Sequence, residues 1–237
     1  MKLSAPIFQL KRQAKKLARD QGLPLHDALD HIARQEGFTS WSLLAAKASG
    51  TRPSAEFLAL LNPGDLALLA ARPAQGKTMM GLELLADAVK VGRNGLFFTL
   101  EYNQAEALAR YRSVAGNAGS PDSDVEIDVS DNISAEHVIE RLKSAPRGTV
   151  AVIDYLQIMD QRRSNPPLAI QVSTLRDFAR RTGVILVFIA QIDRSYVLSD
   201  RPFPGLADIR LPNPLDLTLF SAVCFMNNGK ARIDRLN

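Results

Sequence analysis

The sequence has one cysteine and no long hydrophobic run. A single cysteine, Cys224, in a chain of 237 residues excludes an internal disulfide and a cysteine-based zinc cluster, and its apolar neighbours predict that it is buried. No stretch approaches the ~18 uninterrupted apolar residues of a membrane helix. The basic N-terminus is not followed by the apolar core of a signal peptide. These absences predict a reduced, cytoplasmic protein that does not cross a membrane.

Low-complexity and collagen-like compositions are also absent. Glycine and proline account for only 14 and 13 residues, without any periodic arrangement. Hydrophobic residues make up 46% and charged residues 23% of the chain, close to globular averages, which excludes a disordered protein. The length suits one large domain, or one domain with a small appendage.

The positive charge is concentrated near the N-terminus. Residues 1–52 hold nine of the 29 Lys and Arg but only four of the 25 Asp and Glu, so the rest of the chain is nearly neutral. This asymmetry indicates an appended module that meets an anionic partner. We predict a basic helical module over 1–50, a linker over Lys47–Ser54 and an α/β domain over 55–237. In the latter, apolar strands alternate with amphipathic helices, which is typical of a mostly parallel sheet.

The basic module is predicted to contain three short helices. Apolar residues recur at helical spacing over 7–19 and again over 25–33, Gly37 is a stop signal, and Trp41 begins a third pattern. Four basic side chains of the first helix share one side, Arg12, Lys15, Lys16 and Arg19, and Lys11 lies at its border. Crowded like charges repel unless a partner neutralises them, so a nucleic-acid backbone is one interpretation. A solvated helix face is the other.

The strongest functional signal is a phosphate-binding loop. An apolar strand, Leu66–Ala70, runs into the segment A-R-P-A-Q-G-K-T, and an amphipathic helix follows. A P-loop, or Walker A motif, requires this context of strand, loop and helix, although the strict motif has Gly where this chain has Ala71. Backbone N–H groups of such a loop surround nucleotide phosphates. The residues predicted to bind the nucleotide are Arg72, Pro73, Ala74, Gln75, Gly76, Lys77 and Thr78.

Two carboxylates stand at the ends of further apolar runs. Asp154 follows Val150–Ile153, and Glu101 follows Leu96–Leu100. The carboxyl ends of parallel strands face the ligand crevice of an open α/β sheet, so Asp154 is a candidate acid for Mg²⁺ and Glu101 a candidate base for water. The alternatives are a plain strand-ending acid at Asp154 and, at Glu101, a favourable acid near the start of a helix at Gln104.

A third strand ends at an amide. The segment Gly183–Arg194 is apolar up to Gln191, a side chain suited to sensing a γ-phosphate or a water molecule. The helix before it carries Leu168, Val172 and Leu175 on one face. Such strands joined by helices imply right-handed crossovers and a central parallel sheet.

These motifs, in this order, resemble the C-terminal ATPase domain of DnaB-type replicative helicases, within the RecA-like P-loop fold. The resemblance begins near Phe57 and rests on the segments GDLALLAARPAQGKT, FFTLEYNQAEALARYRSVAG, VAVIDYLQIM, FIAQIDR and RPFPGLADIR. It implies ATP and Mg²⁺ as cofactors. It also implies roles for single residues, with Lys77 on the phosphates, Thr78 and Asp154 on the metal, Glu101 as catalytic base and Gln191 as sensor.

The resemblance further implies a homo-oligomeric ring, a hexamer, in which a neighbouring subunit supplies a cation to each site. The family closes with a K-x-R motif, and the candidates here are Lys230, Arg232 and Arg235. The segments that correspond to the family's DNA-binding loops, roughly Gln161–Pro167 and Ser195–Pro204, are shorter in this chain. Two further nucleic-acid candidates, Arg162 and Arg163, lie in the first of them.

The sequence therefore predicts a DnaB-like enzyme that binds and hydrolyses ATP and acts as a ring on or near DNA. The alternative is a nucleotide-switched, DNA-binding loader or regulator without helicase activity. The short loops favour this alternative, and so does the N-terminal module, which replaces the usual helical domain of the family.

Overall fold

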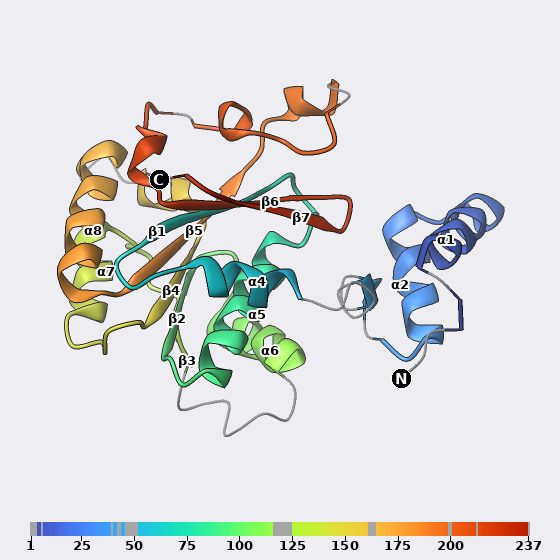
Figure 1. Cartoon of the computed structure of the whole chain (residues 1–237), viewed down its shortest axis with the longest axis horizontal. Helices are drawn as coiled ribbons and strands as arrows, with labels where there is room; N and C mark the ends of the chain where they lie inside the picture. Colours follow the sequence, from blue (N-terminus) through green and yellow to red (C-terminus); the bar gives the residue numbers. More distant parts are fainter. Residues whose placement is uncertain are drawn as a thin grey trace. The chain divides into compact units, whose positions relative to one another are not determined.

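The computed structural model describes the whole chain apart from residues 1–3, 6, 39, 42–43, 46–51, 116–124, 161–164, 199–200, 212 and 237. The chain divides into two units, Met1–Pro53 and Ser54–Asn237 (Figure 1). No helix within the described residues is long and apolar enough to cross a membrane.

The first unit is built on two helices, α1 (Ile7–Gln21) and α2 (Leu25–Gln35). Their apolar faces form a small core together with two residues that follow α2, and its members are Leu10, Ala14, Ile32, Ala33, Trp41 and Leu44. The backbone N–H of Trp41 donates to Asp30 Oδ1 of α2 at 2.9 Å. Residues 41, 44 and 45 are helical, as expected for the third helix, whose other residues lie outside the described part of the chain.

The second unit contains a seven-stranded sheet in the order β3-β2-β4-β5-β1-β6-β7 (Figure 1). The strands are β1 (Leu66–Ala71), β2 (Gly95–Thr99), β3 (Val125–Asp128), β4 (Val150–Asp154), β5 (Ile185–Gln191), β6 (Ala222–Asn227) and β7 (Lys230–Arg235). Neighbouring strands pair in parallel, except that β6 and β7 form an antiparallel hairpin. The predicted α/β class with a mostly parallel sheet is confirmed.

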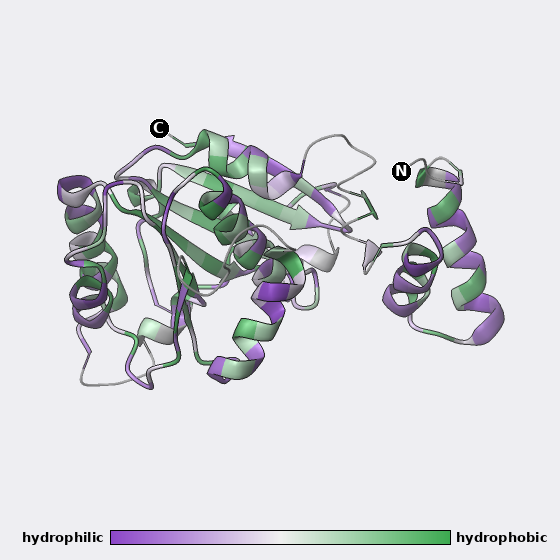
Figure 2. Ribbon diagram, turned by 90° about the horizontal axis from the view of Figure 1, so that it is seen from below, coloured by the Kyte–Doolittle hydropathy of each residue, from purple (hydrophilic) through white to green (hydrophobic). Residues whose placement is uncertain are grey.

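Helices cover both faces of this sheet. On one face pack α4 (Pro53–Leu60), α5 (Lys77–Lys90) and α6 (Gln104–Ala115), and on the other α7 (Ala135–Leu142) and α8 (Leu168–Thr182). Successive side chains of β1 alternate between the two layers, with Leu68 in the α7–α8 core and Leu69 in the α5 core. Both faces are therefore apolar around the central strands, which are coloured mostly as hydrophobic in Figure 2.

Among the described residues, four short 3₁₀ helices lie in the connections after the central strands. They are η1 (Leu156–Asp160), η2 (Arg194–Leu198), η3 (Leu206–Asp208) and η4 (Leu217–Leu219). The segment that contains η2 and η3 returns to the sheet, where Ile192 forms an isolated antiparallel bridge with Ile209. This bridge fixes that segment beside the carboxyl end of β5.

The predicted linker is wrong at its C-terminal end. Pro53 and Ser54 begin α4, where a proline suits the first helical position because its fixed φ matches the helix and its missing N–H is not needed. Ser54 is buried, and its hydroxyl donates to Asp87 Oδ2 of α5 at 2.6 Å. The local composition of Ser, Thr, Gly and Pro indicated a linker, but this long-range hydrogen bond anchors the segment instead.

Candidate active site

The P-loop segment joins the carboxyl end of β1 to the first turn of α5. Gly76 is the N-cap of α5 with a φ of 81°, and Ala74 has a φ of 59°. A Cβ at Gly76 would meet no atom within 4 Å, so its left-handed backbone, not crowding, favours glycine there. The N-terminus of α5 presents unpaired N–H groups and the positive end of the helix dipole, which together favour an anion.

Close packing fixes α5 over the centre of the sheet. A Cβ at Gly81 would lie 3.0 Å from Val152 Cγ1 and 3.1 Å from Ile189 Cδ1. Val152 belongs to β4 and Ile189 to β5, the two strands that end at Asp154 and Gln191. The small residue thus lets the helix approach both strands that carry candidate functional side chains.

Asp154 contacts the P-loop helix from the end of β4. Its side chain is fully buried, and its Oδ2 accepts a hydrogen bond from Thr78 Oγ1 at 2.8 Å. Its Oδ1 is buried without a hydrogen-bond partner among the described residues. Burial raises the pKa of Asp154 to about 6, the Glu101 carboxylate adds to the rise, and the Thr78 hydroxyl and Lys77 ammonium oppose it. A buried, half-satisfied carboxylate is costly unless a cation or donor compensates it.

Replacing Asp154 by Asn should therefore stabilise the ligand-free protein at neutral pH. The amide oxygen still accepts from Thr78, but the buried charge is gone. Because the pKa of the folded carboxyl is raised to about 6 from its usual 3.8, the penalty is complete above the folded value and disappears below pH ~3, where the folded and unfolded states are both protonated. We expect a higher Tm at pH ~7.5, equivalent to about 1–3 kcal/mol, and almost no gain at pH ~3.

Thermal denaturation of wild type and variant at both pH values measures this effect. Asp177→Asn, on the exposed face of α8, is the matched control and should leave the Tm unchanged. An Asp154→Asn protein that is no more stable than wild type at neutral pH would contradict the prediction.

Glu101 lies just beyond the end of β2, beside Asp154. The last residue of β2, Thr99, is the register partner of Asp154, and its hydroxyl accepts the Glu101 N–H at 3.1 Å. The side chain of Glu101 is exposed. The alternative role of Glu101, at the start of α6, is filled by two other residues. Asn103 Oδ1 accepts from Glu106 N at 2.9 Å, and Asn103 N donates to Glu106 Oε2 at 3.3 Å. This reciprocal pair caps α6 without Glu101.

Gln191 completes the row of side chains along this edge of the sheet. It is the last residue of β5 and the register partner of Ala71, where the P-loop begins. Its backbone oxygen accepts from Arg210 N at 2.7 Å, which fixes the strand end. The structure thus brings Gln191 and Asp154 to neighbouring strand ends beside the P-loop.

The side chains at this edge fit a magnesium ion. A threonine hydroxyl and an aspartate carboxylate are hard oxygen ligands, and the unpartnered Oδ1 of Asp154 leaves one acceptor unused. Within the described residues, no group of three or more His, Cys, Asp or Glu side chains is placed to hold a metal by protein ligands alone. Mg²⁺ commonly binds through one or two protein oxygens, with water and substrate phosphates as its other ligands.

The three candidate trans cations differ in their surroundings. Arg235 Nη2 donates to Asp65 Oδ1 at 3.0 Å, just before β1 and therefore at the edge opposite to the P-loop. Arg232 donates to the backbone oxygen of Pro204 at 3.0 Å and stacks 4.9 Å from the Phe225 ring centroid. Lys230 is exposed at the start of β7. Of the three side chains, that of Lys230 is the one without a hydrogen bond or ion pair to another described residue.

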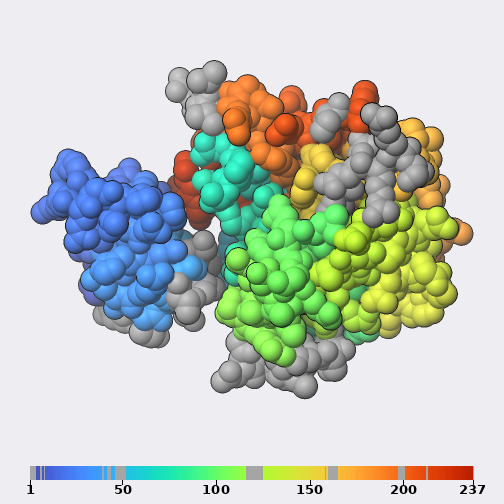
Figure 3. Space-filling view, turned by 180° about the vertical axis from the view of Figure 1, so that it is seen from behind, coloured from blue at the N-terminus to red at the C-terminus, as the bar shows by residue number. Residues whose placement is uncertain are grey.

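The β6–β7 hairpin also reaches the P-loop, which the sequence did not predict. Asn228 and Gly229, with φ values of 51° and 72°, form its two-residue turn. The Asn228 N–H donates to Gln75 Oε1 at 2.8 Å. Figure 3 shows the dark red hairpin beside the teal segment that contains the P-loop. The N-G dipeptide signals the turn, but nothing local in the sequence reveals a contact between residues 153 positions apart.

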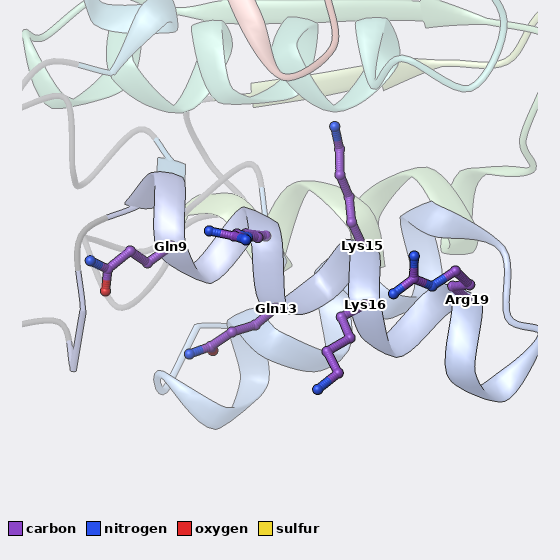
Figure 4. Close-up of a pocket in the computed structure, with 6 residues that line it drawn as sticks. Gln9, Gln13, Lys15, Lys16 and Arg19 are labelled. Carbon is purple, nitrogen blue, oxygen red and sulfur yellow. The ribbon is translucent and has the colours of Figure 1, made fainter.

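The basic side of α1 forms in the first unit as expected. Arg12, Lys15, Lys16 and Arg19 are exposed, and Lys11 is half-buried. Arg19 Nε lies 3.9 Å from Asp20 Oδ1, with both side chains largely in solvent. Four of these basic side chains line a surface pocket together with Gln9 and Gln13, and the labelled ones project from the helix in Figure 4. Arg162 and Arg163 lie outside the described residues.

Curated proteins similar in sequence to this chain include replicative DNA helicases. The replicative DNA helicase DnaB of Leifsonia xyli is 26% identical over 181 residues, which span 63% of this chain and 40% of that protein. The replicative DNA helicase DnaB of Helicobacter pylori is 24% identical over 194 residues, which span 67% of this chain and 40% of that protein. The chain thus covers less than half the length of these relatives. No family model matches the sequence.

Solved structures also resemble this chain in fold. One solved ATPase domain superposes with a TM-score of 0.57 at 19% identity, over 73% of this chain and 74% of that one. A DnaB-like replicative helicase, solved in a study of its interactions with primase, superposes with a TM-score of 0.57 at 15% identity. The superposition covers 92% of this chain and 64% of that one. A KaiC-like protein from Pyrococcus horikoshii gives 0.51 at 15% identity over 68% and 70%. The predicted resemblance is confirmed: the chain is similar in sequence to DnaB replicative helicases and shares its fold with solved ATPase domains of the RecA-like type.

Proposed function

We propose that this protein binds and hydrolyses ATP with Mg²⁺ as a DnaB-like ATPase. The observation that carries the proposal is the contact between Thr78 Oγ1, in the first turn of α5, and the buried carboxylate of Asp154, at 2.8 Å. A helix N-terminus suited to phosphate and an acid suited to a metal meet there at one edge of the sheet. We further propose that the two units of the structure correspond to the predicted module over 1–50 and ATPase domain over 55–237.

Each side chain at this edge has a proposed role. The P-loop N–H groups and Lys77 hold the phosphates, and Thr78 with Asp154 holds the metal. Mg²⁺ bound there supplies positive charge that offsets the charge of the phosphates. Glu101, exposed beside Asp154, accepts a hydrogen bond from the attacking water and orients it towards the γ-phosphate. Gln191 contacts the γ-phosphate or that water.

The proposal extends to assembly and to DNA. Both curated relatives are named replicative DNA helicases, and we propose that this protein likewise works on or near DNA, in the cytoplasm, as a hexameric ring. Each site would then receive a cation from the next subunit. Strand-displacement assays distinguish a helicase from the alternative, a loader or regulator that binds DNA without separating its strands, which the similarity to DnaB does not favour.

The test of the proposal is Lys77→Ala. Lys77 is the first residue of α5 and would donate charge-assisted hydrogen bonds to the phosphates, so its loss should weaken ATP binding about 10- to 100-fold. Isothermal titration with a non-hydrolysable ATP analogue and Mg²⁺ measures the affinity, and circular dichroism checks the fold. Lys90→Ala, at the far end of the same helix, is the control. Equal affinity in a folded Lys77→Ala protein contradicts a P-loop nucleotide site.

A second prediction concerns the basic side of α1. If it binds a nucleic-acid backbone, each phosphate contact releases counterions and adds roughly −0.7 to −0.9 to the slope of log affinity against log salt. Replacing Lys11, Lys15 and Lys16 by Gln should flatten this slope by about two units, and helix propensity is nearly unchanged. Salt titrations of DNA binding by wild type and variant measure it. Identical slopes would mean that α1 presents only a solvated face.

A further inference from the structure

We infer that Gln75 is a positioning residue that fixes the β6–β7 hairpin to the P-loop, so that nucleotide binding orders the hairpin. The inference rests on the proposed nucleotide site and adds a residue to it. The carrying observation is a single contact between distant segments, in which Gln75 Oε1 accepts the Asn228 N–H at 2.8 Å. Gln75 belongs to the segment that would close around phosphate, and Asn228 begins the turn of the hairpin (Figure 1).

The strand pairing brings a second pair of polar side chains to the same place. The parallel register of β1 and β6 ends at Ala71 and Met226, and the next residues along the two segments are Arg72 and Asn227. Each has a buried polar atom without a partner among the described residues, a donor at Arg72 Nε and an acceptor at Asn227 Oδ1. A buried donor and a buried acceptor thus stand unsatisfied at the first positions after the last paired residues of the two strands. They indicate a junction whose hydrogen bonds are incomplete in the ligand-free protein.

The hairpin is also hydrogen-bonded to the segment that follows β5. Asn227 Nδ2 donates to the backbone oxygen of Pro202 at 2.9 Å and lies 3.3 Å from the Tyr196 hydroxyl. Arg232 donates to the backbone oxygen of Pro204 at 3.0 Å. The hairpin is therefore hydrogen-bonded to the P-loop through its turn and to the 202–204 segment through its strands. Ordering the P-loop around phosphate would restrict both the exposed Lys230 at the hairpin end and that segment.

Hydrogen exchange at the Asn228 amide tests the contact directly, because Asn228 is exposed and its amide is held by one side-chain acceptor. Gln75→Met keeps the length of the side chain but removes the acceptor, and should speed exchange of this amide about threefold to tenfold. Gln75→Glu keeps an acceptor and should retain the protection. The Thr218 amide, held by Asp216 Oδ1 at 2.9 Å, is the internal control and should exchange equally in all three proteins.

Adding ADP and Mg²⁺ tests the coupling. In wild type, exchange at Asn228 should slow further when the nucleotide binds. In Gln75→Met it should not change at an ADP concentration that calorimetry shows to saturate the variant. Nucleotide binding without any change at Asn228 in wild type overturns the coupling, and equal exchange in wild type and Gln75→Met overturns the contact. Failure of wild type to bind ADP or ATP would instead overturn the proposed function.

Discussion

Replacing Glu101 by Gln should slow ATP hydrolysis about 10²–10⁴-fold, the range for loss of a positioned general base. The amide has nearly the same size but cannot accept the proton of the attacking water. Affinity for ATP and Mg²⁺ should change little, since the P-loop and Asp154 are untouched. Turnover by phosphate release and affinity by calorimetry give the two values separately, and the expected signature is a fall in kcat at nearly constant Kd.

Glu106→Gln is the matched control for Glu101. Glu106 is also exposed and lies five residues further on, and a glutamine there can still accept the hydrogen bond that caps α6. Its turnover should stay close to that of wild type. If Glu101→Gln also hydrolyses ATP at the wild-type rate, Glu101 is not the base.

Replacing Lys230 by Ala should lower turnover of the assembled protein about 10³-fold, near the lower end of the range for a cation supplied in trans. Lys230 is chosen because its side chain is exposed, whereas Arg232 and Arg235 are bonded within their own domain. Nucleotide affinity should be nearly unchanged if the cation acts on the transition state of the neighbouring site. The expected signature is again a kcat effect.

Mixing two inactive proteins separates a trans role from a local one. A ring of Lys230→Ala and Glu101→Gln subunits contains interfaces that combine an intact Glu101 with an intact Lys230 of the next subunit. Such mixtures should regain part of the wild-type turnover, although neither protein is active alone. Lys143→Ala, an exposed lysine just after α7, is the charge control. Mixtures that remain inactive would remove Lys230 from the shared site.

Most of the central sheet could be predicted because its strands are buried on both faces. The strands expected at Leu66–Ala70 and Leu96–Leu100 are observed at Leu66–Ala71 and Gly95–Thr99. A parallel strand covered by helices on both sides appears in the sequence as a continuous apolar run, which is a strong local signal. The helix ahead of Gly183 was recognisable for a similar reason, because it buries one periodic apolar face.

The parts that escaped prediction are short or depend on distant residues. The edge strand β3 has only four residues with mixed burial, which gives no clear period. The helix α4 follows a segment with the composition of a linker and is held by a hydrogen bond to Asp87. For the candidate site, local sequence motifs were enough to select the candidate residues. Contacts such as Thr78 with Asp154 and Gln75 with Asn228 exist only once the strand order and register are fixed.

Cys224 makes this protein convenient for chemical labelling. It lies in β6 between β1 and β7, is fully buried, and has a thiol pKa raised by burial, whereas maleimides and alkylating agents react with an accessible thiolate. Since the sequence holds no other cysteine, a cysteine introduced on the surface could carry a fluorophore at one defined place without removal of the native residue. The rate at which Cys224 itself is modified would then report the rate at which β6 separates from the sheet.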